Sequence, residues 1–210
     1  MFLTTAQAGK ALGCSGPTLR KLLAAGVVPG AFPAGRMTVI PTDAVEQLRS
    51  RERADLGALR RPEIAVLRVG SGERVEEPDR AWIGFHVDRS EHELLAALSG
   101  WWRCDPARVA AGGVLPVTIA GFVVAVLSGL DEWVADGTGT SLRYRFTGAR
   151  LAGYLTDLTA PVNRITTAPA GTDDRRLADL LLGTRLASQS SGPIAYVSTR
   201  TTTDQPTEGE

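Results

Sequence analysis

The side chains best suited to contact a ligand lie close together near the start of the chain. Ser15 and Thr18 carry hydroxyls, and Arg20 and Lys21 carry positive charges, all within seven residues. Hydroxyls donate hydrogen bonds to phosphate oxygens and base edges, and cations neutralise phosphates, so this grouping indicates nucleic-acid contact. A further cation, Arg36, follows a glycine at the tip of a short loop.

Local signals place this grouping on the second of two short helices. Thr4 or Thr5 can cap a first helix that ends at Gly13, because a left-handed residue commonly ends a helix. Ser15 then caps a second helix, which Gly26 terminates. Helical spacing turns one face of that helix toward a core and leaves its polar residues outside. The inward residues are Leu19, Leu22 and Leu23, and the outward ones are Thr18, Arg20 and Lys21.

A loop and a third helix complete this N-terminal unit. The loop is tipped by Gly35–Arg36, and the helix is predicted from Thr42 to about Arg51. Two helices joined by a tight turn, then a loop and a closing helix, are the order of a helix-turn-helix with a wing. The sequence therefore predicts a DNA-binding domain over residues 1–52.

These residues resemble the excisionase-type branch of the MerR-like winged helix-turn-helix family over about the first quarter of the chain. The matching positions are Leu3–Thr4, Ala8, Ala11–Ser15, Thr18–Leu19, Gly26, Val28–Pro29, Gly35–Arg36 and Ile40–Leu48. In such proteins the second helix enters the major groove, and the wing tip reaches toward the backbone or the minor groove. The resemblance implies DNA contacts from four helix residues and one wing residue, which are Ser15, Thr18, Arg20, Lys21 and Arg36.

Two departures from the family pattern bear on affinity. Gln7 stands where the family usually has an acidic residue, and Arg36–Val39 is less rich in arginine than the family's wings. A weakly basic wing makes fewer phosphate contacts, so tight binding would need a dimer or a second contact surface. An alternative interpretation is a protein-interaction module that has lost DNA binding.

The charge distribution agrees with nucleic-acid contact by the N-terminal unit alone. The whole chain has no net charge, yet residues 1–52 contain six basic and three acidic side chains, and the remainder contains 17 basic and 20 acidic ones. A basic end on a mildly acidic protein favours contact with a polyanion at that end. The cysteines Cys14 and Cys104 are too few for a disulfide framework, and no secretory signal precedes the first helix, so we expect a cytoplasmic protein.

The rest of the chain predicts a mixed α+β domain. Residues 53–62 indicate a linker or a helix extension, residues 63–200 a small curved sheet or barrel-like domain, and residues 201–210 a disordered tail. Alternation, turn residues and a capping box define the elements within it. They are strands over Glu63–Val69 and Ala81–Val87, a polar loop over Gly70–Asp79, a helix from Ser90 to about Leu98, a hairpin around Asp136 returning over Leu142–Phe146, a helix from Thr172 to about Ala187 and a strand over Pro193–Thr199.

An uncharged segment from Val109 to Leu130 is long enough to span a bilayer. Pro116, several glycines and many β-branched residues argue against a membrane helix in this segment. Two buried strands, Val114–Ile119 and Phe122–Leu127, fit this composition better. We therefore expect no contact with a membrane.

Tryptophans mark a second candidate site. Trp101, Trp102 and Arg103 follow the predicted helix, Trp133 lies near a strand end, and Arg145–Gly148 reads Arg-Phe-Thr-Gly. This order resembles PUA-like domains of the EVE and ASCH type over about 80 residues. The resemblance implies a pocket that takes a small ligand or an extruded base and is lined by Trp101, Trp102, Arg103 and Trp133. Burial of the tryptophans in the core is the alternative.

Patterns typical of catalysis are missing from the sequence. His86, Asp88, Glu91 and His92 could converge on a metal, but a capped surface helix explains the last two equally well. The sequence has no nucleophile elbow, phosphate-binding loop or zinc-protease helix, and its two histidines leave few acid–base candidates. We expect no enzymatic activity, no cofactor and no metal.

Taken as a whole, the sequence predicts a DNA-binding transcriptional regulator. Its N-terminal domain would read double-stranded DNA, and the C-terminal domain would form a homodimer, sense a ligand or recruit a partner. Three alternatives stay open: an excisionase-like recombination or architectural factor, a reader of modified or unpaired bases through the aromatic pocket, and an adaptor that binds only proteins.

Overall fold

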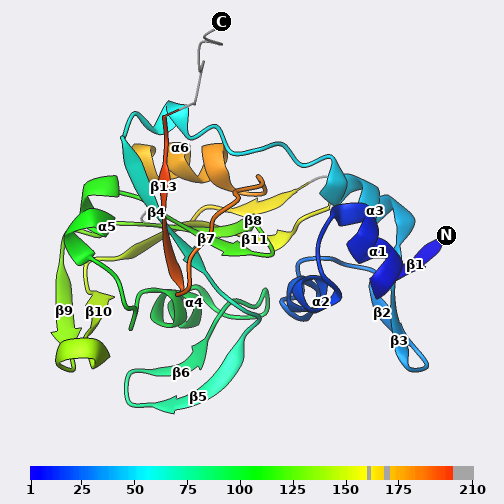
Figure 1. Cartoon of the computed structure of the whole chain (residues 1–210), viewed down its shortest axis with the longest axis horizontal. Helices are drawn as coiled ribbons and strands as arrows, with labels where there is room; N and C mark the ends of the chain where they lie inside the picture. Colours follow the sequence, from blue (N-terminus) through cyan, green and yellow to red (C-terminus); the bar gives the residue numbers. More distant parts are fainter. Residues whose placement is uncertain (160–161, 168–170, 201–210) are drawn as a thin grey trace, which may run out of the picture.

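The computed structural model describes residues 1–159, 162–167 and 171–200, and the predicted tail over 201–210 lies outside them. The structure is mixed α+β with several sheets, as the sequence predicts. Two parts follow one another along the chain (Figure 1). Residues 1–52 are hereafter the N-terminal unit, and residues 63–200 are hereafter the body.

The N-terminal unit consists of three helices and a small antiparallel sheet. In chain order its elements are β1 (Phe2–Thr4), α1 (Thr5–Leu12), α2 (Gly16–Ala24), β2 (Phe32–Ala34), β3 (Met37–Pro41) and α3 (Thr42–Arg49). β3 lies between β1 and β2 and pairs with both. α1 contacts both α2 and α3, so it joins the other two helices.

Side-chain caps fix where the first two helices begin. The Thr4 Oγ1 accepts a hydrogen bond from the Gln7 amide at 3.3 Å, and the Gln7 Oε1 accepts one from the Thr4 amide at 2.9 Å, which closes a capping box. Gly13 ends α1 in the left-handed conformation with φ of +65°, and Ser15 caps α2. These helix boundaries confirm the sequence predictions, although α3 ends at Arg49, slightly earlier than predicted.

Apolar side chains from all three helices and β3 form the core of the N-terminal unit. Burial of a leucine or isoleucine stabilises a fold by roughly 1.5–3 kcal/mol, which is what holds such short helices together. Of the predicted inward positions of α2, Leu19 and Leu22 are fully buried and Leu23 is half-buried against the core. The other buried residues of this core include Ala8, Leu12, Val27, Ile40, Val45 and Leu48.

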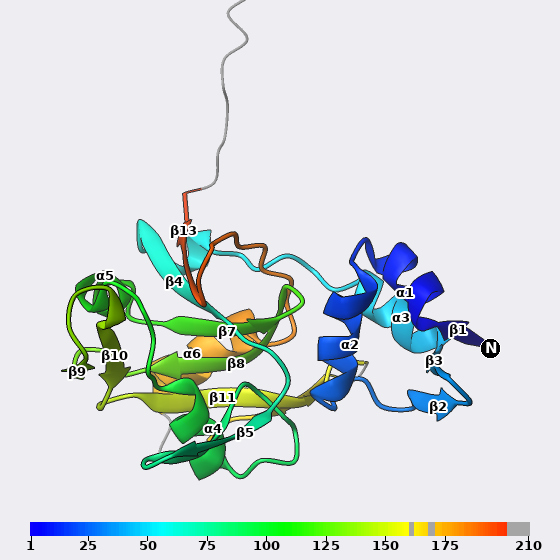
Figure 2. The same cartoon turned by 60° about the horizontal axis from the view of Figure 1, so that its bottom comes forward.

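A six-stranded sheet with the order β12-β11-β8-β7-β4-β13 forms the centre of the body (Figure 2). Its strands are β4 (Glu63–Arg68), β7 (Leu115–Ile119), β8 (Phe122–Ser128), β11 (Arg150–Asp157), β12 (Asn163–Ile165) and β13 (Ile194–Ser198). β4 and β7 run parallel, whereas the other neighbouring strands are antiparallel. Within the described residues β12 and β13 each have one neighbour in this sheet, so the sheet is open and is not closed into a barrel.

The uncharged segment from Val109 to Leu130 is not a membrane helix. It supplies the end of α5 (Pro106–Gly112) and then β7 and β8, whose residues are all buried. Burial on both faces explains why these strands carry no charge and show no alternation. Across the described ranges of the chain, no helix is both long and apolar enough to cross a membrane.

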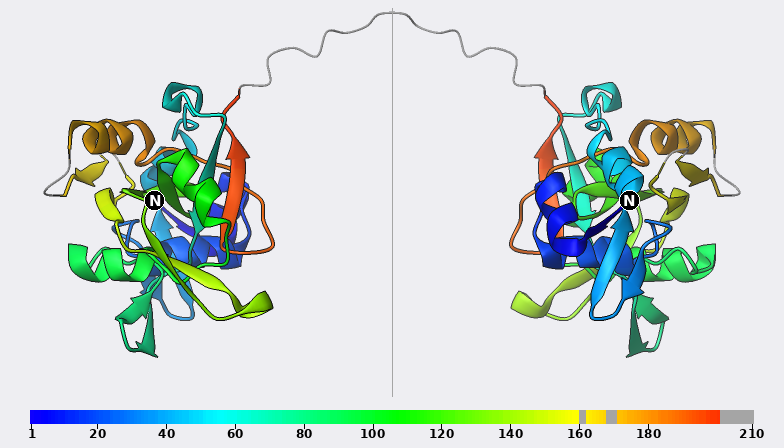
Figure 3. Two further views of the ribbon diagram at one scale, coloured as in Figure 1. Left: turned by 90° about the vertical axis from the view of Figure 1, so that its left-hand side faces the viewer. Right: turned by 90° about the vertical axis from the view of Figure 1, so that its right-hand side faces the viewer.

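Helices and hairpins surround the central sheet. α6 (Thr172–Leu181) and α4 (Glu91–Leu98) both contact β11 and lie on opposite sides of it (Figure 3). A capping box between Ser90 and Glu93 starts α4, as predicted. Two hairpins project from this layer: β5 (Glu73–Glu77) with β6 (Arg80–Ile83), and β9 (Trp133–Asp136) with β10 (Arg143–Phe146).

The structure corrects several predictions for the body. The polar loop over Gly70–Asp79 contains β5, in which every residue except Val75 is charged and exposed, so no apolar alternation marked it as a strand. The last helix stops at Leu181 instead of continuing to about Ala187, because Leu182 is extended and Gly183 then turns the chain with φ of +79°. The predicted strand over Ala81–Val87 is β6, which ends at Ile83 because Gly84 turns the chain with φ of +79°. Three further elements, α5, β11 and β12, were not predicted.

The N-terminal unit is docked on the body through the end of α2. The Val87 amide donates to the Ala25 carbonyl at 3.1 Å, and the Leu158 amide donates to the Val27 carbonyl at 2.8 Å. Gly26 lies between these two bonds with φ of +78°. The buried residues of both parts form one continuous apolar cluster.

The segment over residues 53–62, predicted as a linker or a helix extension, runs along the body. The Arg185 amide donates to the Glu52 carbonyl at 2.7 Å, and the Ala54 amide donates to the Arg185 carbonyl at 2.9 Å. A short 3-10 helix, η1 (Gly57–Leu59), then leads into β4. The segment therefore ties the two parts together and does not extend α3.

We predict that Gly26→Ala destabilises the protein more than Gly13→Ala does. Both glycines have a positive φ, which costs an alanine about 1 kcal/mol. A Cβ on Gly13 meets nothing within 4 Å, whereas one on Gly26 would lie 2.6 Å from the Val87 Cγ2. Chemical denaturation should show a further loss of about 1–3 kcal/mol for Gly26→Ala from overpacking. Equal losses in the two variants would contradict the observed docking of α2 on the body.

Candidate nucleic-acid interface

The start of α2 brings two of the predicted contact residues together. The Ser15 Oγ accepts a hydrogen bond from the Thr18 amide at 3.3 Å and lies 2.8 Å from the Thr18 Oγ1. The cap satisfies an amide that has no helical partner. Ser15 is exposed and Thr18 is half-buried, so both hydroxyls stay close to the surface.

The outward side chains of α2 divide between two directions. Residues three apart lie on the same side of a helix, so Thr18 and Lys21 share a face, and both line a cleft between α2 and the body. Arg20, two residues after Thr18, is exposed and does not line that cleft. The predicted contact residues thus form an outer surface around Arg20 and an inner surface around Thr18 and Lys21.

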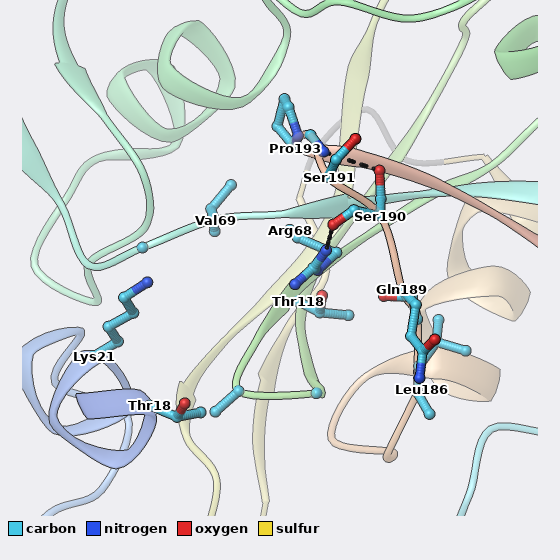
Figure 4. A pocket seen from close by; sticks show the side chains of 16 residues that line it. Thr18, Lys21, Arg68, Val69, Thr118, Leu186, Gln189, Ser190, Ser191 and Pro193 are labelled. Carbon is cyan, nitrogen blue, oxygen red and sulfur yellow. Dashed lines mark hydrogen bonds between the residues drawn. The ribbon is translucent and has the colours of Figure 1, made fainter. Parts of the chain in front are cut away.

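The cleft beside α2, hereafter the α2 cleft, has a volume of about 580 Å³. The carboxyl ends of the parallel strands β4 and β7 supply Arg68 and Thr118, and a loop over residues 186–193 forms the opposite wall. Figure 4 shows Lys21 reaching from α2 toward the body, with Arg68 beside Ser190. The Arg68 Nη1 donates to the Ser190 carbonyl at 2.7 Å, and its amide donates to the Pro193 carbonyl at 2.7 Å.

The segment that the sequence predicts as a wing forms the β2–β3 hairpin. Gly35 turns the chain with φ of +64°, and the adjacent Arg36 is exposed at the tip. Large apolar side chains are exposed on the same sheet: Phe2 is 53% exposed, Phe32 45% and Met37 58%. The rings of Phe2 and Phe32 meet edge to face with centroids 5.2 Å apart. The hairpin therefore presents one cation beside an apolar surface.

In the body, Trp101 lies between two cavities. It lines one cavity of about 300 Å³ with Phe146 and another of about 420 Å³ with Arg143. Its Nε1 donates to the Asp79 carboxylate at 3.1 Å, and the same carboxylate forms an ion pair with Arg145. Sequence patterns did not single out Asp79, because it lies in a β-hairpin distant along the chain.

The other residues of the predicted aromatic pocket point elsewhere. Trp102 is half-buried against the core, where its Nε1 donates to the Leu98 carbonyl at 3.0 Å and the Arg80 guanidinium lies 5.6 Å from its ring centroid. Arg103 is exposed, and Trp133 is 38% exposed on β9. Neither cavity beside Trp101 has Trp102, Arg103 or Trp133 in its lining. The four predicted residues therefore do not form one pocket.

The residues that could converge on a metal are also separated from one another. His86 lies 3.6 Å from the Asp88 carboxylate, while His92 lines the cavity beside Trp101. Burial raises the pKa of the Cys104 thiol to about 11 and also raises that of Cys14, where the positive charge of Arg185 opposes the effect. Over the part of the chain that the structure covers, no group of three or more His, Cys, Asp or Glu side chains could hold a metal ion.

We predict that Ser15→Ala lowers the free energy of unfolding by about 1 kcal/mol, because α2 loses the side chain that caps it. Ser15→Asp should retain most of the stability, since an aspartate caps a helix as well as a serine does. Its negative charge also interacts favourably with the positive N-terminal end of the helix dipole. Chemical denaturation of both variants distinguishes a cap from an ordinary surface hydroxyl. The interpretation of Ser15 as a cap fails if both variants keep the stability of the unmodified protein.

Comparisons with known proteins give no functional assignment, so the geometry of the site is the basis for one. No protein-family model matches the sequence, and no match was found among curated proteins or solved structures. The site consists of three features: a capped, basic helix with one face toward solvent, a hairpin with a single arginine at its tip, and a polar cleft between the helix and the body.

Proposed function

We propose that the protein is a DNA-binding transcriptional regulator whose N-terminal unit is a winged helix-turn-helix. The observation that supports this most strongly is the construction of α2. It follows α1 after a short turn, is capped by Ser15, buries Leu19 and Leu22, and leaves Arg20 and Lys21 exposed. A helix of this kind can insert its exposed side chains into a major groove, as the second helix of a helix-turn-helix does.

The charge on the N-terminal unit favours a polyanion. The first acidic side chain in the sequence is Asp43, so nothing in residues 1–42 offsets the positive side chains. These are Lys10, Arg20, Lys21 and Arg36. None of the four takes part in an ion pair in the described structure. Cations without carboxylate partners can neutralise phosphates and release counterions.

Four cations are few for tight binding to a duplex. A regulator that makes few phosphate contacts per chain gains affinity by binding as a dimer, because two half-sites are then engaged together. We therefore include a homodimer in the proposal, with the body as the part that dimerises, senses a ligand or recruits a partner. A base-reading pocket in the body has less support, since Trp101 lies apart from Trp102 and Trp133.

The experiment that tests this proposal is DNA binding as a function of salt. For Arg20→Ala/Lys21→Ala we expect weaker binding and a slope of log K against log salt that is shallower by about 1.8, or roughly 0.9 for each phosphate that the variant no longer neutralises. Fluorescence anisotropy with a labelled duplex selected from a random library measures both quantities.

The matched control is Arg175→Ala/Arg176→Ala, which removes two neighbouring exposed arginines from α6. It changes the net charge by the same amount but leaves α2 intact, so we expect its slope to stay near that of the unmodified protein. An equal change in the two double variants would mean that only net charge matters, and α2 would not be the reading helix.

A further inference from the structure

The side chains that line the α2 cleft suit one class of ligand. It contains two cations, Lys21 and Arg68, and neither an acidic nor an aromatic side chain. The other polar side chains of the lining carry hydroxyl groups or a carboxamide: Thr18, Thr118, Ser188, Gln189, Ser190 and Ser191. Cations with hydroxyls suit an anion that also carries hydroxyl groups, whereas a stacking nucleobase would find no aromatic face here.

The two cations of the α2 cleft have no acidic partner. Within the described chain, neither Lys21 nor Arg68 forms an ion pair, although Arg68 donates to the Ser190 carbonyl. Two positive charges, one from α2 and one from the end of β4, therefore line the same cleft. An anion placed between them would relieve their mutual repulsion and gain charge-assisted hydrogen bonds.

The position of the cleft in the fold also favours a ligand site. It lies at the carboxyl ends of β4 and β7, the parallel pair of the central sheet, which is where sheets of α/β proteins commonly bind ligands. Thr118 lines the cleft there and is only 3% exposed, and its hydroxyl donates to the Leu67 carbonyl at 3.4 Å. The volume of about 580 Å³ falls within the range of small-molecule sites.

We infer that the α2 cleft binds a small phosphorylated polyol, such as a sugar phosphate, with the phosphate between Lys21 and Arg68 and the hydroxyls against the serine-rich loop. A second part of the inference rests on the proposed function. Because a bound ligand occupies Thr18 and Lys21, it removes two of the side chains that α2 would offer to DNA. The ligand therefore weakens DNA binding, and by thermodynamic reciprocity DNA weakens ligand binding.

Direct binding tests the ligand site without DNA. Calorimetric titration of the full chain at millimolar concentrations would use glucose 6-phosphate, fructose 1,6-bisphosphate, inorganic phosphate and glucose as probes. We expect the two sugar phosphates to bind, inorganic phosphate to bind more weakly and glucose not to bind. If neither sugar phosphate binds, or if inorganic phosphate binds as well as they do, the proposed ligand class is wrong.

Variants of Arg68 locate the site. Arg68→Gln keeps a polar side chain but removes the charge, so we expect sugar-phosphate affinity to fall by about tenfold or more. Arg68→Lys restores the charge and should recover part of the affinity. Arg175→Ala, which removes an exposed arginine on α6, should leave binding unchanged. Equal affinity in Arg68→Gln and the unmodified protein would place the ligand outside the α2 cleft.

Competition then tests the coupling to DNA. Addition of the sugar phosphate should raise the apparent Kd for the selected duplex in the unmodified protein and have much less effect in Arg68→Gln, whose own DNA affinity stays near normal. Unchanged DNA affinity at saturating ligand would overturn the coupling alone. A protein that binds no duplex would overturn the proposed function, while calorimetry would still decide whether the cleft holds a ligand.

Discussion

The docking of α2 on the body is the constraint on which the rest of the site depends. Two backbone hydrogen bonds, from Val87 to Ala25 and from Leu158 to Val27, hold the end of this helix. Gly26 between them has no side chain, so the chains approach closely. Helix α2 therefore has a fixed rotation relative to the central sheet. That rotation decides which polar side chains face solvent and which face the body.

The same constraint creates the α2 cleft. With α2 fixed, Thr18 and Lys21 face the carboxyl ends of β4 and β7, while Arg20 faces away from them. The loop over residues 186–193 completes the wall because Arg68 binds it through both its amide and its guanidinium. Helix α2 thereby offers Thr18 and Lys21 to two ligands, a nucleic acid in the proposed function and a small anion in the α2 cleft. We regard this sharing as the physical basis for regulation in the proposed function.

Local features of the fold could be predicted from the sequence, because caps and glycine turns depend on residues only a few positions apart. Thr4, Gly13, Ser15 and the Ser90–Glu93 box all behave as their residue types indicate. The buried strands β7 and β8 could also be predicted, because a long uncharged segment rich in β-branched residues is typical of strands that are buried on both faces.

The arrangement of the sites could not be predicted in the same way. The sequence placed Thr18, Arg20 and Lys21 together on an outer face, but it carried no signal that the body would cover one side of α2. The four residues of the predicted aromatic pocket were near in sequence or similar in type, yet Trp102 is held by the Leu98 carbonyl and Trp133 lies exposed on a hairpin. Such orientations depend on contacts between distant segments.

The sharpest test of α2 as the DNA-reading helix is amide hydrogen exchange of the full chain with and without a selected DNA duplex. We expect slower exchange on DNA addition at the start of α2 and at the tip of the β2–β3 hairpin, with the central sheet unchanged. Protection confined to the body, around Trp101 or the edge strands, would contradict the assignment of α2 as the helix that enters the groove.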